Sequence, residues 1–271
     1  KKLIGRVDAI TASRLDLRVD VRDNRDEIGQ LAERFNQMLD RLEEAFQLQR
    51  AFVSNASHEL RTPLTAITGQ IEVALMDNNP QEWQDTLRSV LDDARQLNRL
   101  SNGLLSLAKV SMEESAVKLT NVYLDEVFWQ VRSELLKAYP HSGIKVDLAT
   151  FSHKSTHFSV LGNEPLLKIA LTNLLENGVK FSPDHTVEVR FQQVSNVVEV
   201  HFFNRGAAIP PEELPLIFKP FRRGSNARTV AGHGIGLSLT ERIIKLHHGL
   251  LSVDSIPNQG TTFVIILPKK S

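Results

Sequence analysis

Apolar residues recur every three or four positions through most of the first 110 residues of the chain. That spacing predicts amphipathic helices, and the scarcity of proline with many Leu, Arg, Glu, Asp and Gln favours long ones. One helix is expected to open at Asp26-Glu27, with a coiled-coil-like seam made of four residues: Leu31, Phe35, Met38 and Leu42. Residues 15–21 alternate apolar and polar side chains and predict an extended connector. Periodicity alone leaves open a helical hairpin that simply packs.

Residues 50–110 have the pattern of a second helical hairpin. A helix-breaking cluster at residues 77–80, Asp-Asn-Asn-Pro, predicts its turn, and Pro80 suits the first position of the following helix. That helix has an apolar face of seven residues: Trp83, Leu87, Val90, Leu91, Leu97, Leu100 and Leu104.

The helical pattern ends near residue 110. Residues 111–121 lose the periodicity and predict a linker, and from about residue 122 short β-type runs alternate with helical stretches. This alternation predicts an α/β sandwich. The fold class expected is therefore multidomain, with an all-α N-terminal half followed by an α/β sandwich.

Composition narrows the choice of partner. Lys+Arg and Asp+Glu both total 32, so the charge balance favours neither nucleic acid nor a membrane surface. The absence of cysteine excludes disulfides and thiolate metal sites and fits a reducing cytosol. No apolar run approaches the roughly 20 residues that cross a bilayer. The start at Lys1-Lys2, without a secretory signal, suggests a fragment of a longer chain.

His58 lies opposite the apolar stripe of its expected helix. At about 100° per residue, the stripe residues lie roughly 180° to 240° from it: Leu60, Leu64, Ile67 and Ile71. The imidazole is therefore expected to point outward, with Glu59 next to it and Thr62 one turn away.

Pro63 falls inside the same helix and removes a backbone hydrogen bond beside the histidine. An outward histidine with a carboxylate neighbour suits a nucleophile whose partner holds a proton. A solvated surface histidine beside an unrelated glutamate gives the same pattern, and geometry alone favours that plainer interpretation.

The segment His58-Glu-Leu-Arg-Thr-Pro-Leu64 is similar, residue for residue, to the H-box of the sensor histidine kinase family. The resemblance implies that His58 is the phosphoacceptor and Glu59 its acid/base partner. It also implies that Thr62 serves in dephosphorylating the response regulator, and that two hairpins pair as a four-helix bundle in a homodimer. Residues 3–45 likewise resemble a HAMP signal-relay domain.

A second group of polar residues lies in Leu171–Phe181. Asn173, Asn177 and Lys180 share one helical face, while the leucines point elsewhere. Amide oxygens can ligate Mg²⁺, and a nearby lysine can meet phosphate oxygens. A polar surface face of a helix is the common alternative.

Gly232-His-Gly-Ile-Gly-Leu-Ser leads into a further helical run. Closely spaced glycines before a helix offer bare backbone amides to phosphates, although a flexible loop is the usual alternative. No Gly-Lys-Ser/Thr follows, so this is not a Walker loop.

Together, these segments resemble the catalytic domain of the same kinase family, which has the Bergerat (GHKL) ATP fold. Asn173 to Lys180 is similar to its N-box, Ile217 to Arg223 to its F-box, Gly232 to Gly236 to its G2 box, and Gly260 to Phe263 to its closing element. The resemblance implies binding of ATP and Mg²⁺, with Asn177 and Asn173 at the metal. The nucleotide-binding residues that it implies are Asn173, Asn177, Lys180, Phe181, Asn204, Gly206, Ile209, Phe218, Arg223, Gly232, Gly234, Ile235, Gly236, Leu237 and Thr262. Residues 219–236 would form a mobile ATP lid.

One box departs from the family pattern of Asp-x-Gly-x-Gly. Residues 204–209, here called the G1 segment, read Asn-Arg-Gly-Ala-Ala-Ile. Asn204 can accept a hydrogen bond from the adenine amino group but lacks the charge of aspartate, so we expect weak ATP binding. Ala208 replaces a glycine, so a positive φ there would be costly.

The expected function is ATP-dependent autophosphorylation of His58 and transfer to an aspartate of a response regulator. The expected regions are 1–45 (HAMP), 46–110 (dimerisation and phosphotransfer), 111–121 (linker) and 122–271 (catalysis). The full-length protein is expected at the cytoplasmic face of the bacterial inner membrane, anchored by segments absent from this soluble fragment. A weak-binding or phosphatase-dominant member, a scaffold and a Bergerat-fold ATPase clamp remain the alternatives.

Overall fold

The computed structural model describes residues 17–19, 27–76, 80–112, 118–147, 158–227, 230 and 232–269. The chain divides into two compact units, Lys1–Arg61 and Thr62–Ser271, and each is described by itself. Asp26, the rest of the expected connector, residues 77–79 and residues 113–117 of the expected linker lie outside the described residues.

In the first unit, residues 17–19 have no regular secondary structure and pack along helix α2 (Glu27–Met76). The side-chain amide of Asn36 binds both backbone groups of Val19, since Nδ2 donates to its carbonyl and Oδ1 accepts from its N–H, each at 2.9 Å. Arg18 pairs with Glu43 and Asp40, and these hydrogen bonds raise the pKa of its guanidinium. The short segment is thereby fixed to the helix through its backbone.

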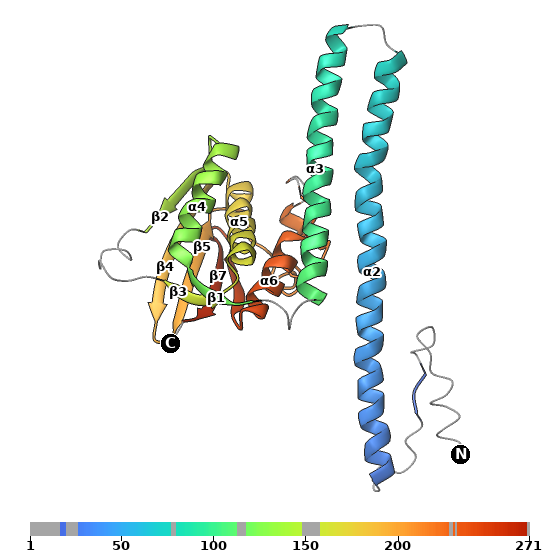
Figure 1. Cartoon of the computed structure of the whole chain (residues 1–271), viewed down its shortest axis with the longest axis vertical. Coiled ribbons are helices and arrows are strands. Elements are labelled where there is room, and N and C mark those ends of the chain that lie inside the picture. Colours follow the sequence, from blue (N-terminus) through green and yellow to red (C-terminus); the bar gives the residue numbers. More distant parts are fainter. Residues whose placement is uncertain are drawn as a thin grey trace. The chain divides into compact units, whose positions relative to one another are not determined.

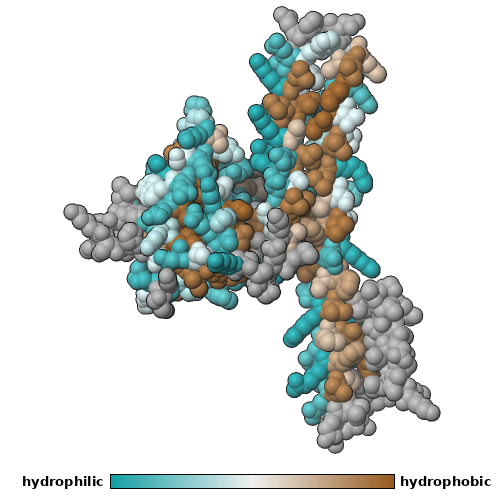
Figure 2. All heavy atoms as spheres, viewed as in Figure 1, coloured by the Kyte–Doolittle hydropathy of each residue, from teal (hydrophilic) through white to brown (hydrophobic). Residues whose placement is uncertain are grey.

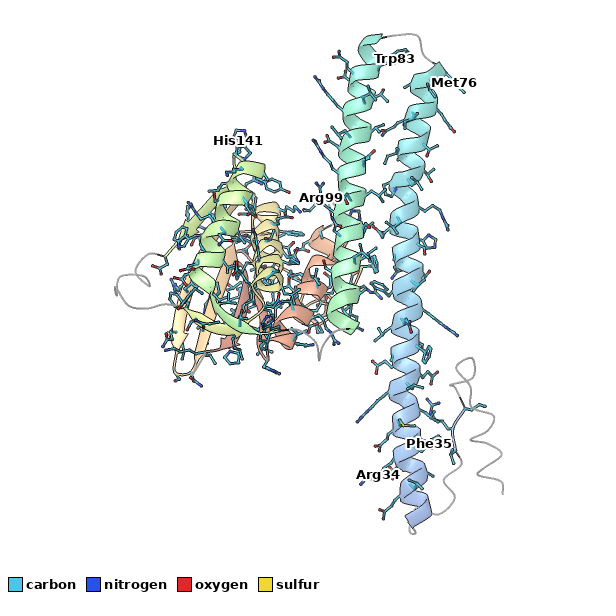
Figure 3. The ribbon with its side chains drawn as sticks, viewed as in Figure 1. Arg34, Phe35, Met76, Trp83, Arg99 and His141 are labelled. Carbon is cyan, nitrogen blue, oxygen red and sulfur yellow. The ribbon has the colours of Figure 1, made fainter. Side chains whose placement is uncertain are left out.

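The predicted helical hairpin is confirmed. Helix α2 contains Pro63 and ends at Met76, and helix α3 (Pro80–Met112) begins with the proline that the sequence places there (Figure 1). Gln70 on α2 donates from Nε2 to the carboxylate of Asp93 on α3 at 3.2 Å. Met76 and Trp83, which flank the expected turn, are both exposed (Figure 3).

The C-terminal region is an α/β sandwich, as predicted. Helices α4 (Leu124–Ala138), α5 (Glu164–Phe181) and α6 (Gly236–Leu246) cover one face of a five-stranded sheet (Figure 1). The sheet has the order β2-β4-β5-β7-β6, with β2 parallel to β4 and the other neighbours antiparallel. Its strands are β2 (Gly143–Val146), β4 (Thr186–Val194), β5 (Val197–Asn204), β6 (Leu250–Ile256) and β7 (Gly260–Pro268). Strands β1 (Thr120–Tyr123) and β3 (Ser159–Gly162) form a separate antiparallel pair.

The core lies between this sheet and its helices. Alternate residues of β4, β5 and β7 are buried, as expected when one face of each strand is covered. Phe191 on β4 packs against Phe128 of α4 and against Phe158, with ring centroids 5.2 Å apart in both pairs. All three rings are fully buried, so the domain has a closed apolar core of its own.

Large apolar side chains are exposed along α2 and α3, where Figure 2 shows a brown surface. They include Leu31, Met38, Leu42, Leu48, Val53, Leu64, Ile71, Val73, Leu75, Leu87, Leu91 and Leu105. We call the residues of this set that lie in the second unit, from Leu64 to Leu105, the hairpin face. Within the part of the chain that the structure describes, no helix combines the length and apolarity needed to cross a membrane.

Candidate functional site

His58 is exposed on helix α2, as the helical geometry predicts. Glu59 is half-buried and Thr62 is exposed. The stripe opposite His58 is only partly covered within one chain, because Leu64 and Ile71 keep 55% and 41% of their exposure. The imidazole of His58 is thus accessible from outside the chain, and the apolar residues on the opposite side of its helix stay partly exposed.

Helix α5 carries the second group of candidate residues, and its first turn is fixed by a buried histidine. Asn163 caps the helix by accepting from the Leu166 N–H at 3.2 Å. The Asn163 N–H donates to Nε2 of His247 at 2.9 Å, and Nδ1 of that ring lies 2.7 Å from the Ile243 carbonyl. The proton is therefore on Nδ1. Burial lowers the pKa of His247, which favours this neutral ring.

Asn173 joins α5 to the start of α6. Its Nδ2 donates to the Gly236 carbonyl at 3.2 Å and lies 3.4 Å from the hydroxyl of Thr240. Thr240 is fully buried and donates to the same carbonyl at 2.9 Å. Asn173 therefore positions the glycine-rich segment, and its Oδ1 takes part in neither bond.

Asn177 and Lys180 lie on the next turns of the same helical face. Asn177 is half-buried, and within the described residues its side-chain amide has no hydrogen-bond partner. Lys180 is held by Glu176 at 2.8 Å. The predicted row of polar groups exists, and one of its members is already neutralised by a carboxylate.

The G1 segment approaches the C-terminal end of α5 very closely. An added Cβ on Gly206 would lie 2.3 Å from the Phe181 carbonyl oxygen, so only glycine fits there. Ser182 is buried beside it and donates to Asp184 at 2.5 Å, which lowers the pKa of that carboxyl. Phe181 and the G1 segment are thus brought together.

Asn204 is the last residue of β5 and lies on the helix-facing side of the sheet, where it is only 5% exposed. Its side-chain amide has no hydrogen-bond partner among the described residues. The residue opposite it on β7 is Thr261, which is also buried. Thr262, the residue predicted from the family pattern, pairs with Phe203 on the other face, because strand side chains alternate.

The rest of the G1 segment is anchored by hydroxyl groups. The Ile209 N–H donates to Oγ of Ser255 at 2.9 Å, and that oxygen lies 2.7 Å from Oγ1 of Thr261. Ala208 has no positive φ, so the strain expected from replacing glycine does not arise.

A backbone hydrogen bond between Phe221 and Gly234 joins the two ends of the expected lid, residues 219–236. The Phe221 N–H donates to the Gly234 carbonyl at 2.8 Å, and both residues have a positive φ, of 62° and 69°. A Cβ on Gly234 would lie 2.8 Å from the Arg222 carbonyl oxygen, which explains the glycine. Phe218, in the predicted F-box, is half-buried just before this closure.

Within the expected lid, two described polar side chains donate to backbone carbonyls. Arg223 donates to the carbonyls of Ala227 and Val230. Asn226 donates to the Ala207 carbonyl of the G1 segment at 3.1 Å, which ties the lid to that segment. No motif in the sequence signals the Asn226 contact.

The glycine-rich segment opens α6 without a side-chain cap. Ile235 occupies the N-cap position and is buried, while Gly232 is exposed. The first backbone N–H groups of α6, including those of Gly236 and Leu237, precede the intrahelical hydrogen bonds. Such a helix start attracts anions through its dipole.

The chain thus combines two parts: helix α2, which carries an exposed histidine, and an α/β sandwich that follows it in the sequence. Residues 162–271 match the family described as histidine kinase-, DNA gyrase B- and HSP90-like ATPase. Residues 48–113 match the His Kinase A (phospho-acceptor) domain, and residues 1–44 the HAMP domain. The chain belongs to the sensor histidine kinase family.

Relatives agree over almost the whole chain. It is 32% identical over 263 residues to the sensor histidine kinase CusS of Escherichia coli K12, covering 96% of this chain and 54% of that protein. It is 31% identical over 254 residues to the histidine-protein kinase ArlS of Staphylococcus aureus USA300, covering 92% and 55%. The chain therefore spans about half the length of the curated relatives it matches.

Solved structures share the fold. The Acinetobacter baumannii histidine kinase AdeS matches with a TM-score of 0.60 at 20% identity, covering 79% of this chain and 98% of that one. Histidine kinase ThkA, solved in complex with the response regulator TrrA, matches with a TM-score of 0.62 at 21% identity, covering 84% and 64%.

Proposed function

We propose that this chain is the ATP-dependent signalling part of a sensor histidine kinase. The proposed regions are 1–45 for HAMP signal relay, 46–110 for dimerisation and phosphotransfer, 111–121 as linker and 122–271 for ATP binding and catalysis. Helix α2 crosses the first of these boundaries without a break, so a displacement near residue 45 is carried directly toward His58.

ATP is proposed to bind between the C-terminal half of α5 and the G1 segment. The observation that carries this proposal is that Asn177 on α5 and Asn204 at the end of β5 both have side-chain amides without hydrogen-bond partners among the described residues. Such an amide keeps its donor and its acceptor for a ligand. Asn204 would reach the base, with Phe181 and Ile209 beside it.

The phosphates are proposed to lie toward the start of α6. Lys180 and Arg223 then exchange their present partners, Glu176 and the lid carbonyls, for phosphate oxygens. Asn177 fits a Mg²⁺ ligand because its amide oxygen is available, and Asn173 keeps its Oδ1 nearby. When bound, Mg²⁺ would supply positive charge that offsets the negative charge of the phosphates.

The reaction proposed at α2 is attack of an imidazole nitrogen of His58 on the γ-phosphorus, with ADP leaving. Glu59 takes the imidazole proton, and the exposure of His58 supports access by the donor. The phosphoryl group then passes to an aspartate of a response regulator. Thr62, one turn further along the helix, is proposed to assist removal of the phosphoryl group from that regulator.

ATP binding is proposed to be weak. Aspartate would form a charge-assisted hydrogen bond with the adenine amino group, worth roughly 1.5–3 kcal/mol, against about 1 kcal/mol for the neutral amide of Asn204. That difference corresponds to about tenfold in affinity.

A second copy of the chain is proposed to cover the hairpin face. Many of its large apolar side chains are exposed in one chain, and large exposed apolar patches are rarely left open to water. The proposed full-length protein is anchored in the bacterial inner membrane, with this part at the cytoplasmic side.

Incubation with Mg²⁺ and γ-labelled ATP tests the proposal, using wild type, His58→Ala and Asn177→Ala. Acid-labile, base-stable label is expected on the wild type and on neither variant. Phosphate release without protein label would favour an ATPase clamp. Neither label nor release would favour a scaffold or a phosphatase-dominant protein, the candidate that the altered G1 segment supports.

A further inference from the structure

Asn204 is a buried residue whose side-chain amide has no hydrogen-bond partner among the described residues. It ends β5 on the helix-facing side of the sheet and is 5% exposed. Its Nδ2 would lie 2.9 Å from a Cβ added to Gly206, so the amide lies against that glycine, which itself abuts the Phe181 carbonyl. The absence of a Cβ at residue 206 leaves the amide unobstructed.

The neighbouring polar side chains are already engaged. Ser182 donates to Asp184, and Ser255 is bonded to Thr261 and to the Ile209 N–H. None of these bonds involves Asn204. In the proposed nucleotide site, the amide of Asn204 is therefore the group left to recognise the base.

An amide and a carboxylate form different hydrogen bonds with the edge of a purine. A 6-aminopurine such as adenine presents a donor at N6 and an acceptor at N1, whereas a 6-oxopurine presents an acceptor at O6 and a donor at N1. An ionised carboxylate only accepts, but an amide carries a donor beside an acceptor and exchanges them by turning half a revolution about its last torsion. Asparagine can therefore pair with either purine edge.

We propose that Asn204 makes the base pocket permissive, so that it accepts 6-oxopurine nucleoside triphosphates nearly as well as ATP. This inference rests on the proposed nucleotide site. With aspartate in this position, O6 of an oxopurine would face a buried carboxylate without a proton between them, and an unpaired buried polar group is what gives strong discrimination.

The test is the ratio of dissociation constants for ITP and ATP, measured by titration calorimetry on the full chain with Mg²⁺. ITP is the better probe because it lacks the 2-amino group of GTP, so steric exclusion does not confuse the result. We expect a ratio within about threefold of one for wild type, and at least about tenfold higher for Asn204→Asp.

Two further variants isolate the position. Asn196→Asp adds the same charge in the exposed turn before the other end of β5, and it should leave the ratio unchanged. Asn204→Ala removes the amide without adding charge and should lower the affinities for ATP and ITP by similar factors. This variant keeps the test meaningful if the aspartate variant folds poorly.

ATP binding with strong rejection of ITP by wild type would overturn the permissive pocket and leave the proposed function standing. Failure of wild type to bind either nucleotide would overturn both. An unchanged ratio in Asn204→Asp, with both nucleotides bound, would also contradict the inference.

Discussion

Large apolar side chains are buried in the α/β domain, whereas many of them are exposed on the helical hairpin. In the α/β domain, Phe128, Phe158 and Phe191 are fully buried, and Phe191 contacts the other two rings. On the hairpin, Val73, Leu75 and Leu87 keep 64% or more of their exposure. The sequence pattern is amphipathic in both regions, so the difference lies in what covers the apolar side.

This difference assigns separate requirements to the two regions. The α/β domain closes its core with its own helices, whereas the helix that carries His58 leaves apolar surface exposed in one chain. Under the proposed function, the nucleotide site is therefore complete within one chain, and the region around His58 is complete only when a second copy covers that surface.

Placing a charge on the hairpin face should have the largest effect. Leu87→Glu is expected to weaken dimerisation by more than about 100-fold, because the carboxylate would be buried against apolar side chains. Sedimentation equilibrium measures the change. Arg88→Glu, at the adjacent and largely exposed position, is the control; an unchanged mass for Leu87→Glu would remove the distinction between the two regions.

A pair of glycine substitutions sharpens the comparison. Gly178→Ala would place a Cβ 2.5 Å from Cγ2 of Val187 between helix and sheet, which should cost about 1–3 kcal/mol of unfolding free energy. Gly69→Ala meets nothing within 4 Å and should stabilise α2 by about 0.5–1 kcal/mol. Urea denaturation of both variants checks the opposite signs, and destabilisation by Gly69→Ala would place that residue inside the dimer contact.

His247 should give the α/β domain a specific acid sensitivity. Its pKa is lowered from 6.5 by burial, so the unfolded chain binds its proton more readily than the folded one. The contribution of neutral His247 to the free energy of unfolding is therefore complete above about pH 6.5. It is lost as the pH falls toward the pKa of the folded state, by at most about 1.4 kcal/mol per pH unit.

Unfolding free energies between pH 5 and 8 test this, with His247→Gln expected to flatten the acid side of the curve. Glutamine can still accept from the Asn163 N–H but does not titrate. His141→Gln is the control, because His141 points away from the domain at the end of α4 (Figure 3). Equal flattening in both variants would refute the assignment.

The smallest effect is expected at Ala208. Because its φ is not positive, Ala208→Gly should change the affinity for ATP by less than about twofold, although it restores the family residue. Titration calorimetry compares it with Asn204→Asp, and a tenfold gain from glycine would show that backbone strain, and not the missing charge, weakens the site.

The sequence predicts those elements well in which apolar residues recur at a regular spacing. The 3.6-residue period indicates α2 and α3, and the breaker cluster at residues 77–80 predicts where α2 ends and α3 begins. The outward position of His58 follows from the same period. Such features depend only on residues close in the chain.

What the sequence does not disclose depends on contacts between distant residues. The bond from Asn163 to His247 joins two elements 84 residues apart, and nothing in either local pattern signals it. Thr261, and not Thr262, shares the face of Asn204 because register decides which side of β7 faces the helices. The partners of Lys180 and Arg223 likewise depend on side-chain conformations that no motif fixes.

The most direct test of the account is to locate the phosphoryl group after reaction with Mg²⁺ and ATP. Trypsin cleaves after Arg50 and Arg61, so residues 51–61 form one peptide that holds His58 together with Ser54 and Ser57. Mass spectrometry under alkaline conditions, with fragmentation that preserves the phosphoramidate, separates these three sites. The account predicts phosphate on His58 alone; phosphate on either serine, or on a different peptide, would contradict it.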